Sequence, residues 1–525
     1  MAEPVPDLSR TELVIGLVGA IGTDLPFVAK RCGSLLTDIF AYEVSQIGVS
    51  DLLRTIEWDD GRDLSPEQED LRLRARMDAG RDLCQGWKAH DALAQLAMLR
   101  ISQIRDDTNG DQSGKPLDRH AFILRSLKRP AEIERLRAVY GSRFVVIGAY
   151  SPRRNRREYL VEKLEESYGT RDERKYALSI DRDLIERDEK ESGEGGQNVR
   201  GTFHQADFFV ETHTGRLDEQ LERSLRVLFG DPLMTPTKDE AGMAQADRAA
   251  RRSAEPGRQV GAAIVNSEGD LLAVGCNEVP RAFGGQYWMD DADVIADPHN
   301  DGREMRRDED TNNVVQSEIA SDVLGRLRDF LKADAADDPE ALTTAILGSR
   351  LGDITEFGRA VHAEMAAITT AARLGVGLNG ATVLTDTFPC HNCARHIITT
   401  GIRRVVYIAP YAKSQAHKLH EDAIVVAPAE PPEKRSTGKV VFEPFIGVAP
   451  RRFDELFAGI KRKDEDGTII VRDFSPPVAE PRLGASTKRA GELEVVAYRA
   501  REDFDLTALR KRLPDLHPRS KERAT

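Results

Sequence analysis

Short runs of apolar, often β-branched residues recur through the first half of the chain, and charged segments separate them. Runs of this length are typical of buried strands, and their arrangement predicts an α/β domain. The predicted strands are 12–19, 121–124, 144–149 and 206–210, and a helix is predicted at 221–229. Asp231 and Pro232 begin a linker. We therefore expect a first domain over residues 1–235 and a boundary between 230 and 245.

The second half of the chain opens with the pattern of a β-hairpin, in which the predicted strands 259–266 and 271–276 flank a turn. The elements predicted after it are a helix at 361–374, a strand at 381–385, a helix at 393–400 and strands at 404–409 and 439–445. The first six elements follow one another in the order β-β-α-β-α-β. We expect them to form a second α/β domain over residues 245–460.

Two segments fall outside this regular pattern. Residues 281–355 form an insertion between the hairpin and the helix that follows it, and they are rich in aspartate. A second metal site or a regulatory nucleotide site is one interpretation of these acids. An acidic surface loop with a helix at 314–331 is the other, and we favour it. Residues 461–525 are predicted to be a C-terminal extension that is partly flexible.

Two short motifs carry the candidate chemistry. His362-Ala363-Glu364 is followed by Pro389-Cys390-His391-Asn392-Cys393. H-x-E followed by P-C-x-x-C is the pattern of zinc-dependent nucleobase deaminases. At this proline and cysteine content, chance produces P-C-x-x-C in about two of a thousand such chains. We therefore predict that His362, Cys390 and Cys393 bind a zinc ion and leave a fourth position open for water.

A structural zinc site is the alternative explanation of these motifs. Structural sites usually close with four protein ligands. The other cysteines, Cys32, Cys84 and Cys276, form no second C-x-x-C pair. Glu364 lies two residues after His362 and has no role in a structural site. We predict that Glu364 is the catalytic acid and base, moving protons between water and a cytosine ring.

Residues 257–410 resemble the deoxycytidylate deaminases. The segments that carry the resemblance are Q-V-G-A-A-I-V-N-S, G-C-N-E-V-P, V-H-A-E-M, F-P-C-H-N-C-A-R-H-I-I and G-I-R-R-V-V-Y. The resemblance implies a cytidine-deaminase-like α/β/α sandwich, and it implies that Asn277 contacts the substrate. The chain departs from the family at Ala366, where the family commonly has asparagine. Lys413 and Ser414 follow the predicted strand 404–409 at its C-terminal end, and they are our candidates for contacting the substrate phosphates.

From about Leu13 to Phe457 the chain resembles the bacterial anti-phage dCTP deaminases. The segments that carry this wider resemblance are G-L-V-G-A-I-G-T-D-L, G-Q-N-V-R-G-T-F-H-Q-A-D-F-F-V, E-F-G-R-A-V-H-A-E-M and P-Y-A-K-S. The resemblance implies a P-loop nucleotide-kinase-like domain fused to a deoxycytidylate deaminase domain. It also implies that deoxycytidine nucleotides are destroyed during phage infection.

The phosphate loop of such a kinase-like domain is expected directly after the first strand. When G-x-x-x-x-G-K-[ST] is counted from Gly19, Leu25 stands in the place of the lysine and Pro26 in the place of the hydroxyl residue. We therefore predict a degenerate loop that does not hydrolyse ATP in the usual way. The candidates that remain for nucleotide binding in an altered mode are Gly19, Gly22 and Thr23.

The composition of the chain disfavours some classes of function. A net charge of −13 and an aromatic content of 6% are unfavourable for a polynucleotide cytosine or adenine editor, which needs a basic groove with aromatic platforms. Five cysteines and the absence of an 18-residue apolar run predict a cytoplasmic protein without a membrane partner.

The predicted function is zinc-dependent hydrolytic deamination of free dCTP and/or dCMP to deoxyuridine nucleotides, which depletes dCTP as antiviral defence. The alternatives are a polynucleotide editor and a nucleotide sensor with a structural zinc ion. We expect a homo-oligomer and leave open whether an inhibitory RNA or protein restrains the enzyme.

Overall fold

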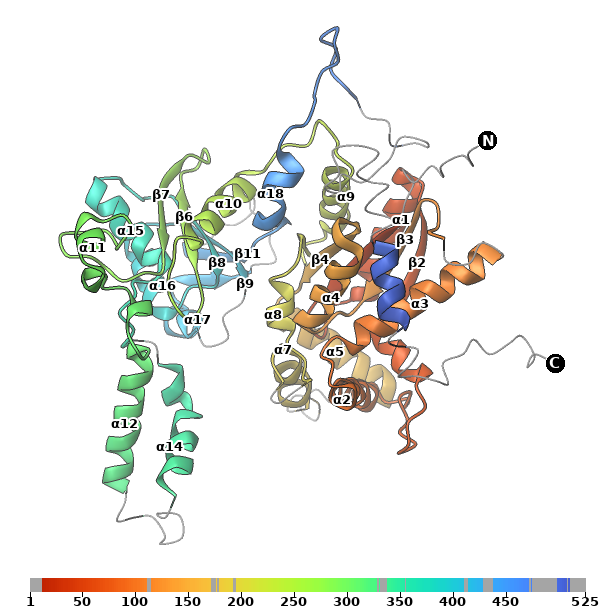
Figure 1. Cartoon of the computed structure of the whole chain (residues 1–525), viewed down its shortest axis with the longest axis horizontal. Helices are drawn as coiled ribbons and strands as arrows, with labels where there is room; N and C mark the ends of the chain where they lie inside the picture. The colour runs from red at the N-terminus through yellow and green to blue at the C-terminus, as the bar shows by residue number, and fades with distance from the viewer. Residues whose placement is uncertain are drawn as a thin grey trace. The chain divides into compact units, whose positions relative to one another are not determined.

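The computed structural model describes residues 12–110, 115–170, 176, 179–191, 195–327, 330, 338–354, 356–409, 414–427, 438–471, 474, 498–507 and 509. The chain divides into two compact units (Figure 1). The first contains Met1–Pro236 and Ile446–Thr525, and the second contains Thr237–Phe445. Within the described residues, no helix has the length and apolar character needed to cross a membrane.

The first unit is built on a six-stranded sheet with the order β12-β5-β4-β1-β3-β2. Its strands are β1 (Leu13–Val18), β2 (Glu43–Gly48), β3 (His120–Arg125), β4 (Phe144–Tyr150), β5 (Phe208–Glu211) and β12 (Gly447–Val448). Five of the strands run parallel, and β12 pairs antiparallel with β5 at one edge. All residues of β1 are buried, as expected for a central strand covered on both faces.

Helices connect and cover these strands. They are α1 (Leu25–Phe40), α2 (Glu69–Trp87), α3 (Ala92–Asn109), α4 (Pro130–Tyr140), α5 (Arg153–Tyr168), α7 (Arg187–Glu189), α8 (Val199–Phe203), α9 (Leu217–Leu228) and α18 (Pro450–Phe457). Asp24 begins α1, since its carboxylate accepts a hydrogen bond from the Phe27 amide and Pro26 lies in the first turn. Strand β2 had escaped the sequence analysis because it is an edge strand with little apolar surface.

The return of the chain to the first unit after Phe445 corrects the expected domain assignment. We had placed residues 446–460 at the end of the second domain. Instead, Gly447 and Val448 pair with Phe209 and Phe208 of β5, and Val448 and Leu456 are buried in the core of the first unit. The physical reason is that β5 would otherwise leave its edge amides and carbonyls without partners.

Part of the C-terminal extension is also integrated into the first unit. Residues 498–507 are helical, and Tyr498, Glu502 and Leu506 are buried. Described residues of the predicted flexible extension therefore contribute to the core of this unit.

The second unit has a mixed six-stranded sheet with the order β10-β11-β9-β8-β6-β7. Its strands are β6 (Gly261–Val265), β7 (Leu271–Cys276), β8 (Thr382–Thr387), β9 (Arg404–Ala409), β10 (Ile424–Val426) and β11 (Val440–Pro444). Strand β6 runs antiparallel to β7 and β8, and the other neighbours are parallel. This arrangement confirms the hairpin and the predicted order of the elements that follow it.

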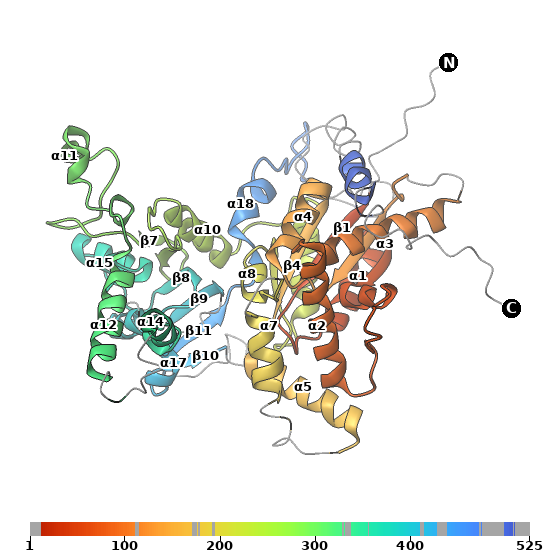
Figure 2. The same cartoon turned by 60° about the horizontal axis from the view of Figure 1, so that its bottom comes forward.

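The helices of the second unit are α10 (Lys238–Ala250), α11 (Ala292–Ala296), α12 (Thr311–Leu327), α14 (Pro339–Leu347), α15 (Ala363–Leu374), α16 (His391–Thr399) and α17 (Ala416–Leu419). The first of them begins with a capping box, in which Thr237 and Glu240 each bond the other's backbone amide. The insertion forms α11, α12 and α14, and α12 and α14 lie side by side as a helical pair that projects from the sheet (Figures 1 and 2).

Candidate metal centre

The N-termini of α15 and α16 bring the three predicted zinc ligands together. His362 is the N-cap residue of α15, and Cys390 is the N-cap residue of α16, with Cys393 one turn into that helix. His362 Nδ1 lies 3.3 Å from Cys390 Sγ and 3.5 Å from Cys393 Sγ. Zinc–sulfur bonds of ~2.3 Å and a zinc–nitrogen bond of ~2.1 Å at tetrahedral angles would separate sulfur from nitrogen by about 3.6 Å. The arrangement therefore fits a zinc ion.

These three side chains are the candidate metal ligands among the described residues, and their ligand atoms all lie within 4.8 Å of one another. Three ligands leave one tetrahedral position for water, as in catalytic rather than structural sites. Three of the acids in the insertion pair with arginines. Asp291 and Asp293 pair with Arg281, and Asp301 pairs with Arg303. A second group of metal ligands is not present in the described part of the insertion.

Burial and hydrogen bonding give the thiols of Cys390 and Cys393 different pKa values. The Cys393 thiol donates a hydrogen bond to Cys390, and together with the His362 imidazolium it lowers the pKa of Cys390 to about 4. The same hydrogen bond raises the pKa of the Cys393 thiol well above its usual value. The hydrogen bond with Cys390 raises the pKa of His362 to about 9. The two cysteines thus hold one thiolate by themselves, and a zinc ion held by His362, Cys390 and Cys393 would favour the thiolate form of both.

Glu364 lies in the first turn of α15 and is 5% exposed. Burial raises the pKa of its carboxyl group to about 7. Glu364 is not one of the three grouped ligands. A buried carboxyl group next to an open metal position has the geometry of a proton-transfer group.

A glycine that the sequence analysis did not single out sets the position of α15. A Cβ atom on Gly275, in β7, would lie 2.4 Å from the Ala363 carbonyl oxygen and 2.4 Å from the Ala367 amide nitrogen. Real Cβ atoms do not approach backbone atoms so closely. Glycine at this position therefore allows the helix that carries His362 to pack directly on the strand. Sequence alone offers no signal for this contact, because 88 positions separate the two segments that meet.

A second residue whose role the sequence analysis did not identify is Glu356, directly after the insertion. Its Oε1 lies 3.1 Å from His391 Nε2 and accepts a hydrogen bond of 3.1 Å from Asn392 Nδ2. These two residues lie between the cysteine ligands in the sequence. Glu356 therefore links the segment after the insertion to the N-terminus of α16, which carries the two cysteine ligands.

Two of the three residues predicted to contact the substrate, Asn277 and Ser414, bond the backbone near the metal centre. The side-chain amide of Asn277 accepts a hydrogen bond of 2.7 Å from the Val260 amide and donates one of 2.7 Å to the Arg258 carbonyl. The Ser414 hydroxyl donates to the Pro389 carbonyl, 2.8 Å away, directly before the first cysteine ligand. Asn277 and Ser414 thus support the backbone around the site, and Lys413 lies outside the described residues.

In the first unit, the predicted phosphate loop is occupied by the chain's own side chains. The Gly19 carbonyl accepts a hydrogen bond from Lys128 Nζ, and the Ile21 amide donates to Asp188 Oδ2 at 2.7 Å. Gly22 has a positive φ of 85°, and a Cβ atom there would lie 2.5 Å from the Arg156 carbonyl oxygen. The buried Thr23 hydroxyl lacks a hydrogen-bond partner in the described structure.

Comparison with known proteins agrees with the geometry of the second unit. Residues 236–409 match the family described as "Cytidine and deoxycytidylate deaminase zinc-binding region". The second unit therefore contains a region similar to the zinc-binding region of these deaminases, and its group of one histidine and two cysteines is suited to hold zinc as a cofactor.

Individual relatives match parts of the chain. The deoxycytidylate deaminase of Enterobacteria phage T2 is 42% identical over 55 residues, which are 10% of this chain and 29% of that protein. A protein of Drosophila melanogaster named "Probable deoxycytidylate deaminase" is 26% identical over 213 residues, 39% of this chain and 78% of its own. The structure of the dCMP deaminase from cyanophage S-TIM5 with dCMP and dUMP is 17% identical, with a TM-score of 0.22, and covers 40% of this chain and 99% of its own.

Proposed function

We propose that the second unit hydrolyses the exocyclic amine of free deoxycytidine nucleotides, dCTP and/or dCMP, and releases deoxyuridine nucleotides and ammonia. The observation that carries this proposal is the buried Glu364 beside a group of three metal ligands. The names of the phage and insect relatives support deoxycytidylate as the substrate class.

In the proposed reaction, one water molecule is added at carbon 4 of the cytosine ring and ammonia leaves. Zinc, when bound by His362, Cys390 and Cys393, supplies a water of lowered pKa. The Glu364 carboxylate takes the two protons of the water in turn, and it passes one to the ring nitrogen and the other to the departing amine. A pKa near neutrality suits a group that both accepts and donates within one turnover.

Contacts to the sugar and phosphates are part of the same proposal. Asn277, Lys413 and Ser414 stay our candidates for substrate binding. Since Asn277 and Ser414 already bond the backbone of the site, we expect each to affect KM by positioning the segments around residues 258–260 and 389. Ala366, where the family commonly has asparagine, leaves room for contacts that differ from those of the relatives.

Depletion of dCTP as antiviral defence is the biological role that we propose, with the first unit as a P-loop kinase-like domain. The resemblance to anti-phage dCTP deaminases supports this role. The parallel sheet order β2-β3-β1-β4-β5 supports the kinase-like assignment of the first unit. A deaminase of this kind must be restrained before infection, because it would otherwise exhaust its host's dCTP. Expression of the chain alone tests where the restraint lies: toxicity indicates an external RNA or protein inhibitor, and harmless expression of active protein indicates control within the chain.

A nucleotide panel tests the proposed reaction. The zinc-loaded protein is incubated with dCTP, dCMP, CTP, deoxycytidine and single-stranded DNA, and ammonia release is measured for each. We expect release from dCTP or dCMP that disappears in Glu364→Gln. Release from single-stranded DNA alone would replace the proposal with a polynucleotide editor. Zinc binding without release from any substrate would favour a sensor with a structural metal.

A further inference from the structure

The helices α12 and α14, here called the arm, have too few neighbours to cover their apolar side chains. They project from the sheet of the second unit (Figures 1 and 2), and valine, isoleucine and leucine recur through both helices. None of the described residues of α14 is buried, and α12 buries only Gln316 and Ala320. An apolar stripe on a helix is normally packed against another element. The arm is therefore incompletely covered by the part of the chain that the structure describes.

A groove of about 770 Å³ follows the exposed side of α12. The residues that line it recur every three or four positions, so they lie on one side of the helix. They are Glu309, Asp310, Asn313, Val314, Ser317, Glu318 and Ser321. The short serine side chains at two successive turns leave room for a second helix to approach closely. The shape of the groove therefore suits another helix.

Negative charge collects in this groove without a counter-charge. Glu309, Asp310 and Glu318 form no ion pair with any residue that the structure describes. Asp310 caps α12 by accepting a hydrogen bond from the Asn313 amide, but Glu318 lies in the middle of the helix, where the helix dipole does not stabilise it. Burial raises the pKa of the nearby Glu255, and the charge of Asp310 raises it further. The groove therefore attracts a cationic group.

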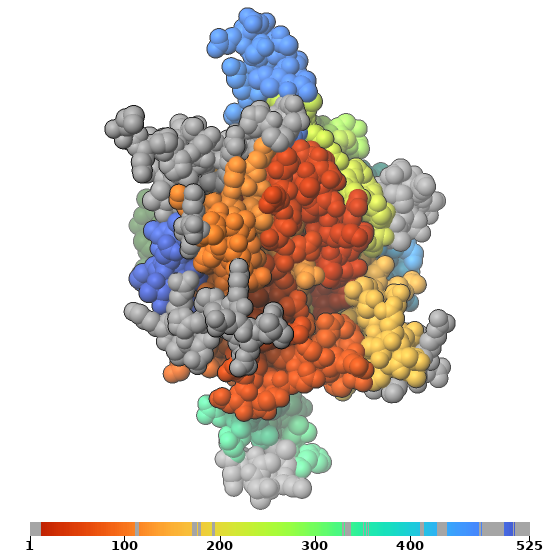
Figure 3. Space-filling view, turned by 90° about the vertical axis from the view of Figure 1, so that its right-hand side faces the viewer, coloured from red at the N-terminus to blue at the C-terminus, as the bar shows by residue number. Residues whose placement is uncertain are grey.

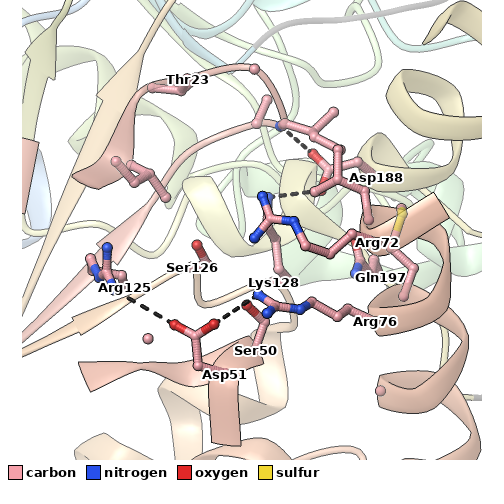
Figure 4. Close-up of a pocket in the computed structure, with 18 of the residues that line it drawn as sticks. Thr23, Ser50, Asp51, Arg72, Arg76, Arg125, Ser126, Lys128, Asp188 and Gln197 are labelled. Atoms are coloured by element: carbon pink, nitrogen blue, oxygen red, sulfur yellow. Dashed lines mark hydrogen bonds and ion pairs between the residues drawn. The ribbon is translucent and has the colours of Figure 1, made fainter. Parts of the chain in front are cut away.

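The carboxylates in the cavity of the first unit, in contrast, are balanced by the chain itself. This cavity lies at the carboxyl ends of β1, β2 and β3, and Figure 3 shows the face of the unit, which is hollowed between its N-terminal segments and α5. Asp51 pairs with Arg76 and with Arg125, and Asp188 pairs with Lys128 (Figure 4). Acids and cations of one unit thus meet there, whereas the described lining of the arm's groove contains acids without cations.

The other end of α12 carries the groups that this groove lacks. Arg326, in the last turn, has a side chain that is 77% exposed, and it pairs with Asp322 one turn earlier. Leu327 is 43% exposed, and Phe330, after the end of the helix, is 83% exposed. Arginine and aromatic side chains contribute most to the binding free energy of many protein interfaces. This end of the arm is therefore suited to insert into an acidic groove.

The groove and this exposed end complement each other when a second copy of the same helix is present. Ile319 is the middle residue of α12. When two copies of the helix run antiparallel about a two-fold axis at Ile319, Ser317 of one copy faces Ser321 of the other. Arg326 of one copy then lies within about one helical turn of Glu309 in the other. Each end thus meets the oppositely charged end of its neighbour, as a two-fold symmetric interface requires.

We propose that two copies of this chain associate through their arms. The two α12 helices pack antiparallel, and Arg326 and Phe330 of each copy insert into the acidic groove of the other. Contact along a helix of 17 residues, about 26 Å, is smaller than a standard protein interface, so the association is weak and depends on concentration. This surface goes beyond the proposed deamination, because it uses none of the residues of the metal centre.

Sedimentation velocity of the full-length, zinc-loaded protein tests the proposal. We expect the average mass to rise with concentration between about 1 and about 100 µM, the range of weak specific association. Arg326→Glu should lower the association constant by at least about tenfold, because like charges then meet at the groove. Glu309→Lys should lower it by a similar factor for the same reason. No turnover is measured, so the result does not depend on whether the second unit is a deaminase.

The double variant Arg326→Glu with Glu309→Lys is the decisive measurement. It restores opposite charges between the copies, so its association constant should return close to that of the unmodified protein. Within one copy the two positions lie about 25 Å apart, which is too far for an ion pair, so the recovery requires a second copy. A second charge reversal at that distance cannot repair a loss of folding in either single variant.

The matched control is Arg251→Glu. The side chain of Arg251 is 69% exposed and pairs with Asp247 four positions earlier, as Arg326 does with Asp322, but it lies outside the arm. The association constant of this variant should equal that of the unmodified protein. Equal effects of Arg251→Glu and Arg326→Glu would overturn the proposal, as would a mass that is the same at all concentrations and in all variants. Failure of the double variant to recover would also overturn it, because a different surface would then join the copies.

Discussion

The guanidinium group of Arg105 lies 2.5 Å from the carboxylate of Glu502, although 397 positions separate these residues in the chain. Both side chains are fully buried. Arg105 also binds Glu12 through two hydrogen bonds of 2.7 Å, and Tyr140 donates to Glu502 at 2.5 Å. Residues near both ends of the chain are thus joined inside the first unit.

Removing one charge of this network should strongly destabilise the first unit. In Glu502→Ala, Arg105 keeps one carboxylate partner but loses the other, and Tyr140 loses its acceptor. We expect the free energy of unfolding to fall by about 3 kcal/mol or more, measured by urea denaturation. The control is Asp503→Asn, since the side chain of Asp503 is 62% exposed and should change stability by about 1 kcal/mol or less. Equal effects of the two variants would contradict the role of burial.

Glu364→Gln should separate chemistry from metal binding. The amide keeps the shape of the side chain but cannot accept a proton, so kcat for dCTP or dCMP should fall by about 10² to 10⁴-fold. Zinc content, measured by atomic absorption, should stay near one ion per chain because Glu364 is not among the grouped ligands. His362→Ala is the comparison that should lose both zinc and activity. A normal rate in Glu364→Gln would rule out its catalytic role.

Gly275→Ala should disturb the metal centre from the strand beneath it. The added methyl group meets backbone atoms of α15 at 2.4 Å, so the helix that carries His362 must move. We expect a loss of stability of about 1–3 kcal/mol together with weaker zinc binding. Competition with a chromophoric chelator measures the zinc affinity. Gly257→Ala is the matched control, because a Cβ atom there meets nothing within 4 Å. Unchanged zinc affinity in Gly275→Ala would show that the helix position does not set the site.

Asp386, in β8, should make the stability of the second unit depend on pH. Burial raises the pKa of its carboxyl group to about 6, above the ordinary value of about 3.9. The folded state therefore holds this proton more tightly than the unfolded state. Between about pH 4 and pH 6, the contribution of Asp386 to the free energy of unfolding should decline by about 2 kcal/mol as pH rises.

Asp386→Asn removes this contribution. Its melting temperature relative to the unmodified protein should therefore increase from pH 4.5 to pH 6.5 at equal zinc concentration. The exposed Asp422 provides the control Asp422→Asn, for which we expect no such trend. A constant difference across this pH range would contradict a raised pKa for Asp386.

The sequence by itself determined the candidate metal ligands and the elements that carry them. In H-A-E and P-C-H-N-C, the chemistry lies within five consecutive residues at a helix N-terminus, and the spacing of the ligands is therefore fixed by local geometry. The strands β1, β3, β4, β6, β7 and β9 were likewise predictable, because each is a run of apolar residues between turn signals. These features depend on neighbours in the sequence.

Only the tertiary structure decided which distant segments meet. The return of Gly447 and Val448 to the first unit, the contact of Gly275 with α15, and the burial of Glu502 against Arg105 all join positions far apart in the chain. The ion pairs of Asp51 with Arg76 and Arg125 are of the same kind, since the three residues come from three separate elements. Long-range packing places these groups together, and no local periodicity encodes that packing.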